Sequence, residues 1–287
     1  MRSCLNAVTT GYPRDLHAWV GVAQRHGFDG VEFPVNDLAK LVEEQGLDAA
    51  RRLQIESGVS LAVFGLPVEW RKGEDTFRKG LDALDHLTAV AAAAGCSRAS
   101  TYVLPSTEFD PGPYALQVVR RLRACCEVLG AHGIRLAIEW VGTPSLRQGK
   151  TPFLWTAGHA VELCDAIGLS NAGLLFDSWH WYTTGASPED LERVPAGRIM
   201  HVHVNDAPDL PMDQQRDNVR LLPGDSGVID LVTMLSVLEE KGYDGFTAIE
   251  TFSKELPQLG VEAAAGKAKA ALDGVRAALD RRRSRPQ

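Results

Sequence analysis

The chain has 287 residues, of which 45% are hydrophobic and 23% are charged, with a formal net charge of -7 and a pI near 5.6. These values are typical of a globular protein with a sizeable core and exclude a largely disordered chain. The acidic balance, with basic residues clustered only at Arg281, Arg282 and Arg283, argues against nucleic acid as a partner.

The sequence contains no apolar run of the roughly 20 residues that a membrane span needs. Its N-terminal segment, MRSCLNAVTTGYPRD, has no basic region followed by an apolar stretch. We therefore expect a cytoplasmic protein that has no membrane partner. The five cysteines are an odd number without CxxC spacing, which is typical of a reducing compartment and of buried, unreactive thiols.

Short apolar runs alternate with segments of helical spacing from one end of the chain to the other. Helical patterns cover 82–94 and 231–241, for example, and an Ala-rich helix is predicted over 263–279. The predicted strands are 5–8, 30–35, 60–66, 99–103, 135–141, 173–177, 199–204 and 246–252.

The segments HGFDGVEF at 26–33 and KGYDGFTAIE at 241–250 are nearly the same phrase, in which a helix ends at a Gly just before a strand. Eight such alternations close either into a barrel or into an open doubly wound sheet. The count of eight, without a Gly-rich phosphate turn, favours a single (β/α)8 TIM barrel over 1–280. The basic tail at 281–287 is expected to be disordered.

Four of the predicted strands end in side chains that can bind a metal ion. Side chains alternate along a strand, and active sites of barrels lie at the C-terminal strand ends. Ile138 and Val202 occupy the parity that suits packing against helices, so the opposite parity should point into the barrel mouth. The residues of that parity at the strand ends are Glu139, Asp177, His203 and Glu250.

Three buried carboxylates beside one imidazole would repel each other unless a cation lay between them. One divalent metal ion resolves this conflict. Three oxygen donors and one nitrogen favour Mn²⁺, Mg²⁺ or Co²⁺ over a closed structural zinc site. The ligand set does not exclude catalytic Zn²⁺ or Fe²⁺. The alternative is that Glu139 and Glu250 pair with arginines at the barrel rim.

Six motifs recur at the strand ends. They are GVEF with Glu32, AIEW with Glu139, FDSWH with Asp177 and His180, HVHVND with His203, LPGDSGVID at 222–230, and AIE with Glu250. In these motifs the chain resembles, over nearly its whole length, the xylose isomerase-like TIM barrel family of sugar isomerases and epimerases. Relatives in that family include ketose 3-epimerases, hydroxypyruvate isomerases, inosose dehydratases and endonuclease IV. The resemblance implies that the four strand-end residues hold the metal and that Glu139 and Glu250 also act as acid and base.

Other residues near these motifs are expected to complete the site. The resemblance implies that His180 reaches a substrate oxygen, the alternative being a solvated loop histidine. Arg220 is a further candidate for contact with substrate oxygens. Trp140 and Trp179 are expected to form an aromatic wall for the substrate, and His201 and Asp206 to orient His203 or to shape the barrel floor.

A metal that binds a carbonyl and an adjacent hydroxyl stabilises the enediolate formed when a base removes the proton between them. Proton transfer between Glu139 and Glu250 would then give epimerisation or isomerisation. No basic cluster or Gly-rich helix start offers a phosphate site in the strand-end loops. We therefore expect a small-molecule substrate that is an unphosphorylated sugar, keto-sugar or polyol-derived carbonyl compound.

The main alternative is a lyase that expels a β-oxygen from the same intermediate, such as an inosose or dehydroshikimate dehydratase or an enzyme that cleaves 3-oxo-glycosides. A DNA-repair endonuclease is disfavoured, because that branch needs additional histidines and a basic groove. A barrel without catalytic activity, used for binding, is the third alternative. Relatives often form dimers or tetramers, so a homo-oligomer is compatible with the sequence, which does not identify an interface.

Overall fold

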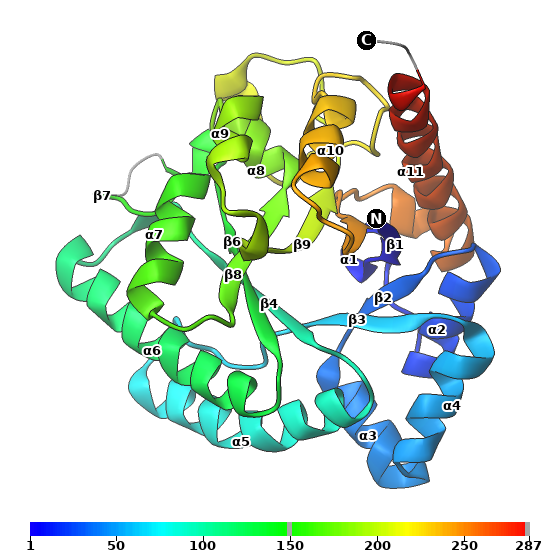
Figure 1. The fold of residues 1–287 in the computed structure, drawn as a ribbon, viewed down its shortest axis with the longest axis vertical. Helices are drawn as coiled ribbons and strands as arrows, with labels where there is room; N and C mark the ends of the chain where they lie inside the picture. Colours follow the sequence, from blue (N-terminus) through cyan, green and yellow to red (C-terminus); the bar gives the residue numbers. More distant parts are fainter. Residues whose placement is uncertain (148–150, 285–287) are drawn as a thin grey trace.

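Eight parallel strands close into a barrel in the order β1-β10-β9-β8-β6-β4-β3-β2 (Figure 1). This computed structural model describes residues 1–147 and 151–284. The closed barrel confirms the predicted fold class and the count of eight β/α units. The barrel strands are β1 (Arg2–Leu5), β2 (Gly30–Phe33), β3 (Ser60–Gly65), β4 (Arg98–Val103), β6 (Arg135–Trp140), β8 (Ala172–Asp177), β9 (Ile199–Val204) and β10 (Phe246–Ile249).

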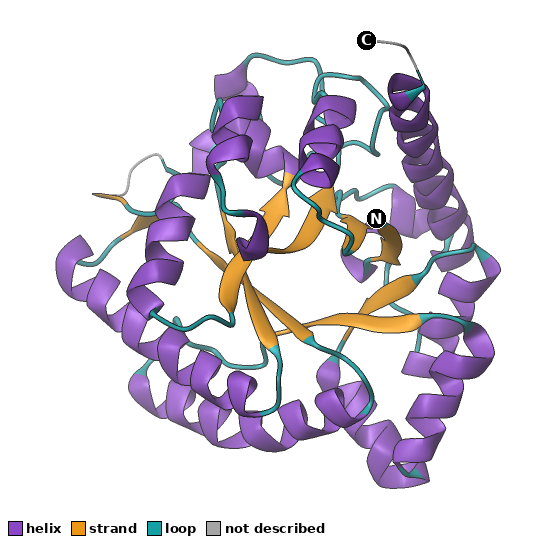
Figure 2. Ribbon diagram, viewed as in Figure 1, coloured by secondary structure: helices purple, strands orange, loops and turns teal. Residues whose placement is uncertain are grey.

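Helices surround the strands as an outer layer (Figure 2). Outside the barrel, β5 (Ser106–Thr107) and β7 (Thr151–Pro152) pair as a short antiparallel sheet. Short 3-10 turns lie at Pro144–Leu146, Ala196–Arg198, Met212–Gln214 and Leu256–Leu259. The helices are α1 (Ala7–Thr10), α2 (Leu16–Arg25), α3 (Val35–Gln45), α4 (Leu47–Ser57), α5 (Glu74–Ala93), α6 (Pro111–Ala131), α7 (Ala157–Ile167), α8 (Ser178–Thr183), α9 (Pro188–Arg193), α10 (Leu231–Glu240) and α11 (Val261–Arg283).

The repeated helix-to-strand turn is present as predicted. Gly27 follows α2 with φ of +72°, and Gly242 follows α10 with φ of +81°. Only glycine adopts this left-handed backbone without strain, and the chain can therefore leave the helix and enter the next strand within a few residues.

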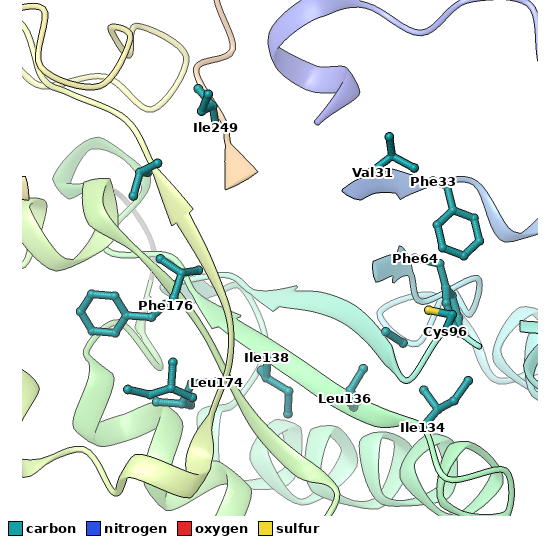
Figure 3. Close-up of a cluster of buried hydrophobic side chains, with 14 of the residues drawn as sticks. Val31, Phe33, Phe64, Cys96, Ile134, Leu136, Ile138, Leu174, Phe176 and Ile249 are labelled. Carbon is teal, nitrogen blue, oxygen red and sulfur yellow. The ribbon is translucent and has the colours of Figure 1, made fainter. Parts of the chain in front are cut away.

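The strands separate two kinds of side chain by alternation. Leu136, Ile138 and Leu174 are fully buried and lie on the side of the strands that faces the helices (Figure 3). These side chains belong to the main hydrophobic core, which fills the space between barrel and helices. The intervening residues face the barrel interior, so Glu139 points opposite to Ile138, as the parity argument predicted.

Several boundaries differ from the sequence-based expectation. The strands predicted at 30–35 and 246–252 end at Phe33 and Ile249. The first strand ends at Leu5, because the side chain of Asn6 caps α1 by accepting the backbone N–H of Val8. The expected disorder of 281–287 was wrong for its first part, since α11 continues through Arg283, which pairs with Glu239 and Asp280. The remainder of that tail, 285–287, lies outside the described residues.

The cysteines are buried and form no disulfide within the described chain, as predicted. Burial raises the pKa of Cys96 to about 12, so its thiol stays protonated and unreactive at neutral pH. Across residues 1–147 and 151–284, no helix combines the length and the apolar character that a membrane crossing requires.

Candidate metal centre

The four predicted ligands meet at the C-terminal ends of neighbouring strands. Glu139 lies in β6, Asp177 ends β8, His203 lies in β9, and Glu250 follows β10 directly. One ligand atom from each side chain lies within 4.8 Å of those of the other three. Each residue is at most 9% exposed. Strand parity was therefore sufficient to predict which side chains meet here.

Two buried ligand atoms face this cluster without a hydrogen bond. They are Oε1 of Glu139 and Nδ1 of His203, and neither makes a hydrogen bond to a described residue. Nδ1 of His203 lies 3.5 Å from Oε2 of Glu250, 3.7 Å from Oδ2 of Asp177 and 3.8 Å from Oε1 of Glu139. A buried polar atom without a partner costs about 1–3 kcal/mol. Three carboxylates and one imidazole around such atoms fit a divalent cation.

Glu32, in β2, contacts the opposite side of the His203 ring. Its Oε1 lies 2.8 Å from Nε2 of His203 and 2.8 Å from Nε2 of His201, and accepts from both. Its Oε2 accepts from the side-chain amide of Asn6 at 3.1 Å. A carboxylate on the outer nitrogen of a metal-binding imidazole fixes the orientation of the ring. No role was predicted for Glu32, although its inward parity in the GVEF motif was a usable signal. His201 and His203 contact the same oxygen of Glu32.

Glu32, His201 and His203 form a second group whose atoms are close enough to hold an ion. Both groups need His203, and a neutral imidazole has one nitrogen with a lone pair and one with a proton. If Nδ1 of His203 binds an ion, Nε2 keeps its proton and donates it to Glu32. The two groups are therefore mutually exclusive for a neutral ring, and the four-residue group offers more ligands.

The two glutamates expected to act as acid and base lie in different electrostatic environments. Burial raises the pKa of Glu139 well above its usual value, and the charges of Glu250 and Asp177 raise it further. Burial alone would also raise the pKa of Glu250, but His203 and Arg220 bring it below its usual value. Without an ion, the pKa of Glu139 is thus displaced upward and that of Glu250 downward, and such opposite displacements are typical of an acid–base pair.

The D-x-x-H motif spans the junction between β8 and α8. Oδ1 of Asp177 caps the helix by accepting the backbone N–H groups of Trp179 and His180, at 2.6 and 3.3 Å. Nδ1 of His180 accepts the N–H of Gly142 at 3.1 Å. Its Nε2 lies 3.3 Å from Nη2 of Arg220 and 3.9 Å from Oε1 of Glu139. His180 is therefore buried beside the ligands and is not a solvated loop residue; burial lowers its pKa to about 4.

Arg220 is a counter-ion of the ligand cluster. Its Nη1 lies 3.2 Å from Oδ2 of Asp177 and 2.9 Å from Oε2 of Glu250. Its Nη2 lies 2.9 Å from Oδ1 of Asp217, and its guanidinium carbon lies 4.6 Å from the centre of the Phe252 ring. The charge of this buried arginine offsets the buried carboxylates. The sequence had suggested only a contact with substrate oxygens.

The aromatic wall predicted from two tryptophans is not formed by them. Trp140 alternates with Glu139 on β6, so its ring faces the helices and meets Phe176 edge to face at 5.2 Å. Trp179 is fully buried, and its Nε1 donates to Oγ1 of Thr143 at 2.9 Å. Among the described residues, neither ring lines the cavity above the ligands.

Asp206 was expected to orient His203 or to shape the barrel floor, but its hydrogen bonds go to a loop. Its carboxylate accepts the backbone N–H groups of Ser226, Gly227 and Ile229 at 3.0, 2.7 and 3.0 Å. Asp206 therefore anchors the LPGDSGVID loop. Proximity in the sequence to the seventh-strand motif had suggested a role that the side-chain direction excludes.

A cavity of about 720 Å³ opens above the ligand cluster. Glu32, Glu139, His203 and Glu250 line its buried end. The cavity lies at the C-terminal strand ends, where barrels bind their ligands. Its volume is within the range of about 300–1,000 Å³ that small-molecule sites occupy.

Comparisons with known proteins agree with this architecture. A family model described as a xylose isomerase-like TIM barrel matches residues 20–278. An inosose isomerase from Halalkalibacterium halodurans is 28% identical over 272 residues, which cover 94% of this chain and 94% of that protein. Both alignments include all four residues of the ligand cluster within their span of the chain.

Two solved structures share the fold. A xylose isomerase domain protein from Alicyclobacillus acidocaldarius superposes with a TM-score of 0.88 and 30% identity, covering 98% of this chain and 99% of that one. The IOLI protein, solved with a zinc atom bound, superposes with a TM-score of 0.80 and 23% identity, covering 96% of this chain and 98% of that one. Together with the family match over 20–278, this shows that the chain belongs to the xylose isomerase-like TIM barrel family.

Proposed function

We propose that this protein is a divalent-metal-dependent isomerase or epimerase of an unphosphorylated, polyhydroxylated carbonyl compound, with a cyclic ketone of the inosose type as the first candidate. The observation that carries the proposal is the buried cluster of four potential ligands below the cavity, in which Glu139 and Glu250 lie together. The inosose isomerase relative, aligned over nearly its whole length, supports the substrate class.

Glu139, Asp177, His203 and Glu250 would hold the ion. When bound, a divalent ion polarises a substrate carbonyl and makes the neighbouring C–H bond more acidic. Mn²⁺ is the first candidate on the basis of the ligand set, and Mg²⁺, Co²⁺, Zn²⁺ and Fe²⁺ are the others. The zinc atom in the IOLI structure supports a divalent ion in this fold.

The protein's own groups can carry out the proton transfers. With the ion held, the ionised Glu250 would remove the proton from the carbon beside the carbonyl. Glu250 could return that proton itself, and Glu139 could deliver one from the other side after taking it up from solvent. Delivery to the other face of that carbon gives epimerisation, and delivery to the neighbouring carbon gives isomerisation. Burial lowers the pKa of His180 to about 4, so a neutral imidazole would contact a substrate oxygen.

Proton exchange in heavy water tests this function. Protein loaded with Mg²⁺ and incubated with an inosose in D₂O is expected to place deuterium on the carbon beside the carbonyl, as followed by NMR. Glu250→Gln should slow the exchange by about 10²–10⁴-fold. Asp85→Asn, which breaks a surface pair with His132, is the matched control and should exchange normally.

The same spectra separate the alternatives. Formation of an unsaturated product with loss of water would identify a dehydratase and replace the isomerase proposal. Exchange at the normal rate in Glu250→Gln, or in protein treated with a chelator, would show that neither this carboxylate nor an ion takes part.

A further inference from the structure

The cavity extends beyond the ligand cluster to a rim of exposed apolar side chains. Val8, Tyr102 and Leu104 line it and are 40%, 45% and 41% exposed. We refer to these three residues as the rim cluster. Exposed apolar side chains scattered singly are ordinary, but several on the wall of one cavity indicate a surface for a ligand.

Tyr102 provides a flat surface within the rim cluster. The guanidinium carbon of Arg71 lies 3.8 Å from the centre of the Tyr102 ring and 4.3 Å from that of the Trp70 ring, so it is held between two aromatic faces. Nη2 of Arg71 also donates to the carbonyl oxygen of Tyr102. These contacts hold the phenol ring in one orientation and cover one of its faces, and the exposed part of the ring borders the cavity. An ordered ring of this kind is suited to offset stacking with a planar group.

Apolar residues line the cavity between the members of the rim cluster. The ends of β2 and β3, with Phe33, Pro34, Leu66 and Val68, lie between β1, which Val8 follows, and β4, which contains Tyr102. The cavity thus has a polar, metal-binding end and an apolar end. Its volume of about 720 Å³ lies in the upper part of the range of about 300–1,000 Å³ for small-molecule sites, which suits a ligand larger than one sugar ring.

We propose that the rim cluster is a second subsite, which binds a flat apolar substituent attached to the polyhydroxylated carbonyl ring. An aromatic ring joined to an oxidised sugar is the simplest substrate of this class. The inference rests on the proposed function for its polar half only. The charged residues of the rim do not favour an anionic substituent, because Arg71 is already stacked and hydrogen-bonded and Lys72 shares the wall with Glu69.

Two stable glucosides that differ only in the apolar group test the subsite. Phenyl β-D-glucopyranoside should bind about tenfold more tightly than methyl β-D-glucopyranoside, because its ring would bury additional apolar surface. Titrations followed by saturation-transfer NMR give both affinities. A Tyr102→Ala/Leu104→Ala double variant should bring their ratio to about one without weakening the methyl glucoside. Ile55→Ala removes a side chain that is 80% exposed on α4 and should leave the ratio unchanged.

Equal affinities for the two glucosides, or no saturable binding of the phenyl glucoside, would overturn the inference. So would a preference for the phenyl glucoside that survives in the double variant, or tighter binding of glucose 6-phosphate than of either glucoside. A dimer that the double variant converts to a monomer would overturn it as well. Such a dimer would show that a second copy of the chain covers the rim cluster. None of these measurements needs turnover, so they test the subsite even if the proposed isomerase activity is absent. Conversely, the protein can turn over an inosose without an aromatic substituent and still show no preference for the phenyl glucoside.

Discussion

The two nitrogens of His203 contact different groups, with Nε2 on Glu32 and Nδ1 toward the ligand cluster. Glu32→Gln keeps the size of the side chain but removes the charge that holds the Nε2 proton. We expect affinity for Mn²⁺, measured by titration calorimetry, to fall about 10–100-fold. Asp85→Asn, which removes the carboxylate 2.8 Å from His132 on the surface, should leave it unchanged. Unchanged affinity in Glu32→Gln would mean that the ring is oriented without this carboxylate.

Protons compete with an ion for the same atoms. Burial and the neighbouring carboxylates raise the pKa of Glu139. For His203, burial alone would lower the pKa, but Glu32 and Glu250 raise it well above its usual value. Ion binding must displace these protons, so affinity should rise with pH until both groups are deprotonated and then level off. Calorimetry in buffers of different ionisation enthalpy should detect about one to two protons released per ion at neutral pH. Binding without proton release would contradict this coupling.

Strand alternation made the four ligands predictable, since residues of one parity face the barrel interior. The same rule places Trp140 outward, next to Glu139, so that error was avoidable from the sequence. Trp179 and Asp206 follow the ends of strands, where alternation no longer fixes the direction of a side chain. The contact of Arg220 with Asp177 joins residues 43 positions apart, and no local pattern indicates it.

At the scale of elements, the loop after β6 packs tightly against α8. A Cβ atom on Gly142 would lie 2.5 Å from Cγ2 of Thr184 and 2.7 Å from the carbonyl oxygen of His180. Gly142→Ala should therefore lower the free energy of unfolding by about 1–3 kcal/mol and disturb the hydrogen bond that fixes His180. Urea unfolding measures the change.

Gly274, which is exposed in α11, gives the matched comparison. A Cβ atom there meets nothing within 4 Å, so Gly274→Ala should stabilise the protein by about 0.5–1 kcal/mol through helix propensity. Equal effects of the two substitutions would show that the contact between the β6 loop and α8 is not tight.

Element boundaries were less predictable than element types. The apolar pattern of 5–8 suggested a strand, yet Asn6 caps a short helix there, and the strand uses Arg2–Leu5 instead. The alternation of apolar residues does not record where a polar side chain ends a strand. The α8 helix was also missed, because its six residues are too few for a helical period to be visible.

Across the whole molecule, closure of the barrel brings distant parts of the sequence into the site. Glu32 meets His201 and His203 across separations of 169 and 171 residues, because β1 pairs with both β2 and β10. The count of eight repeated units predicted this closure. The resulting contacts could not be predicted residue by residue, since they depend on the shear of the closed sheet as well as on the order of its strands.

The ligand cluster joins residues from four neighbouring strand ends, so an ion there should stabilise the whole barrel. An ion that binds only the folded state at 100 times its Kd contributes about 2.7 kcal/mol, which for a chain of this size raises the Tm by about 4–5 °C. Calorimetric melting with added Mn²⁺ and after chelation measures the shift. His203→Ala should abolish it, whereas His132→Ala, on the surface beside Asp85, should retain it. A shift that persists in His203→Ala would place the ion elsewhere, and a Tm that chelation and added Mn²⁺ leave unchanged would remove the metal from the proposed function.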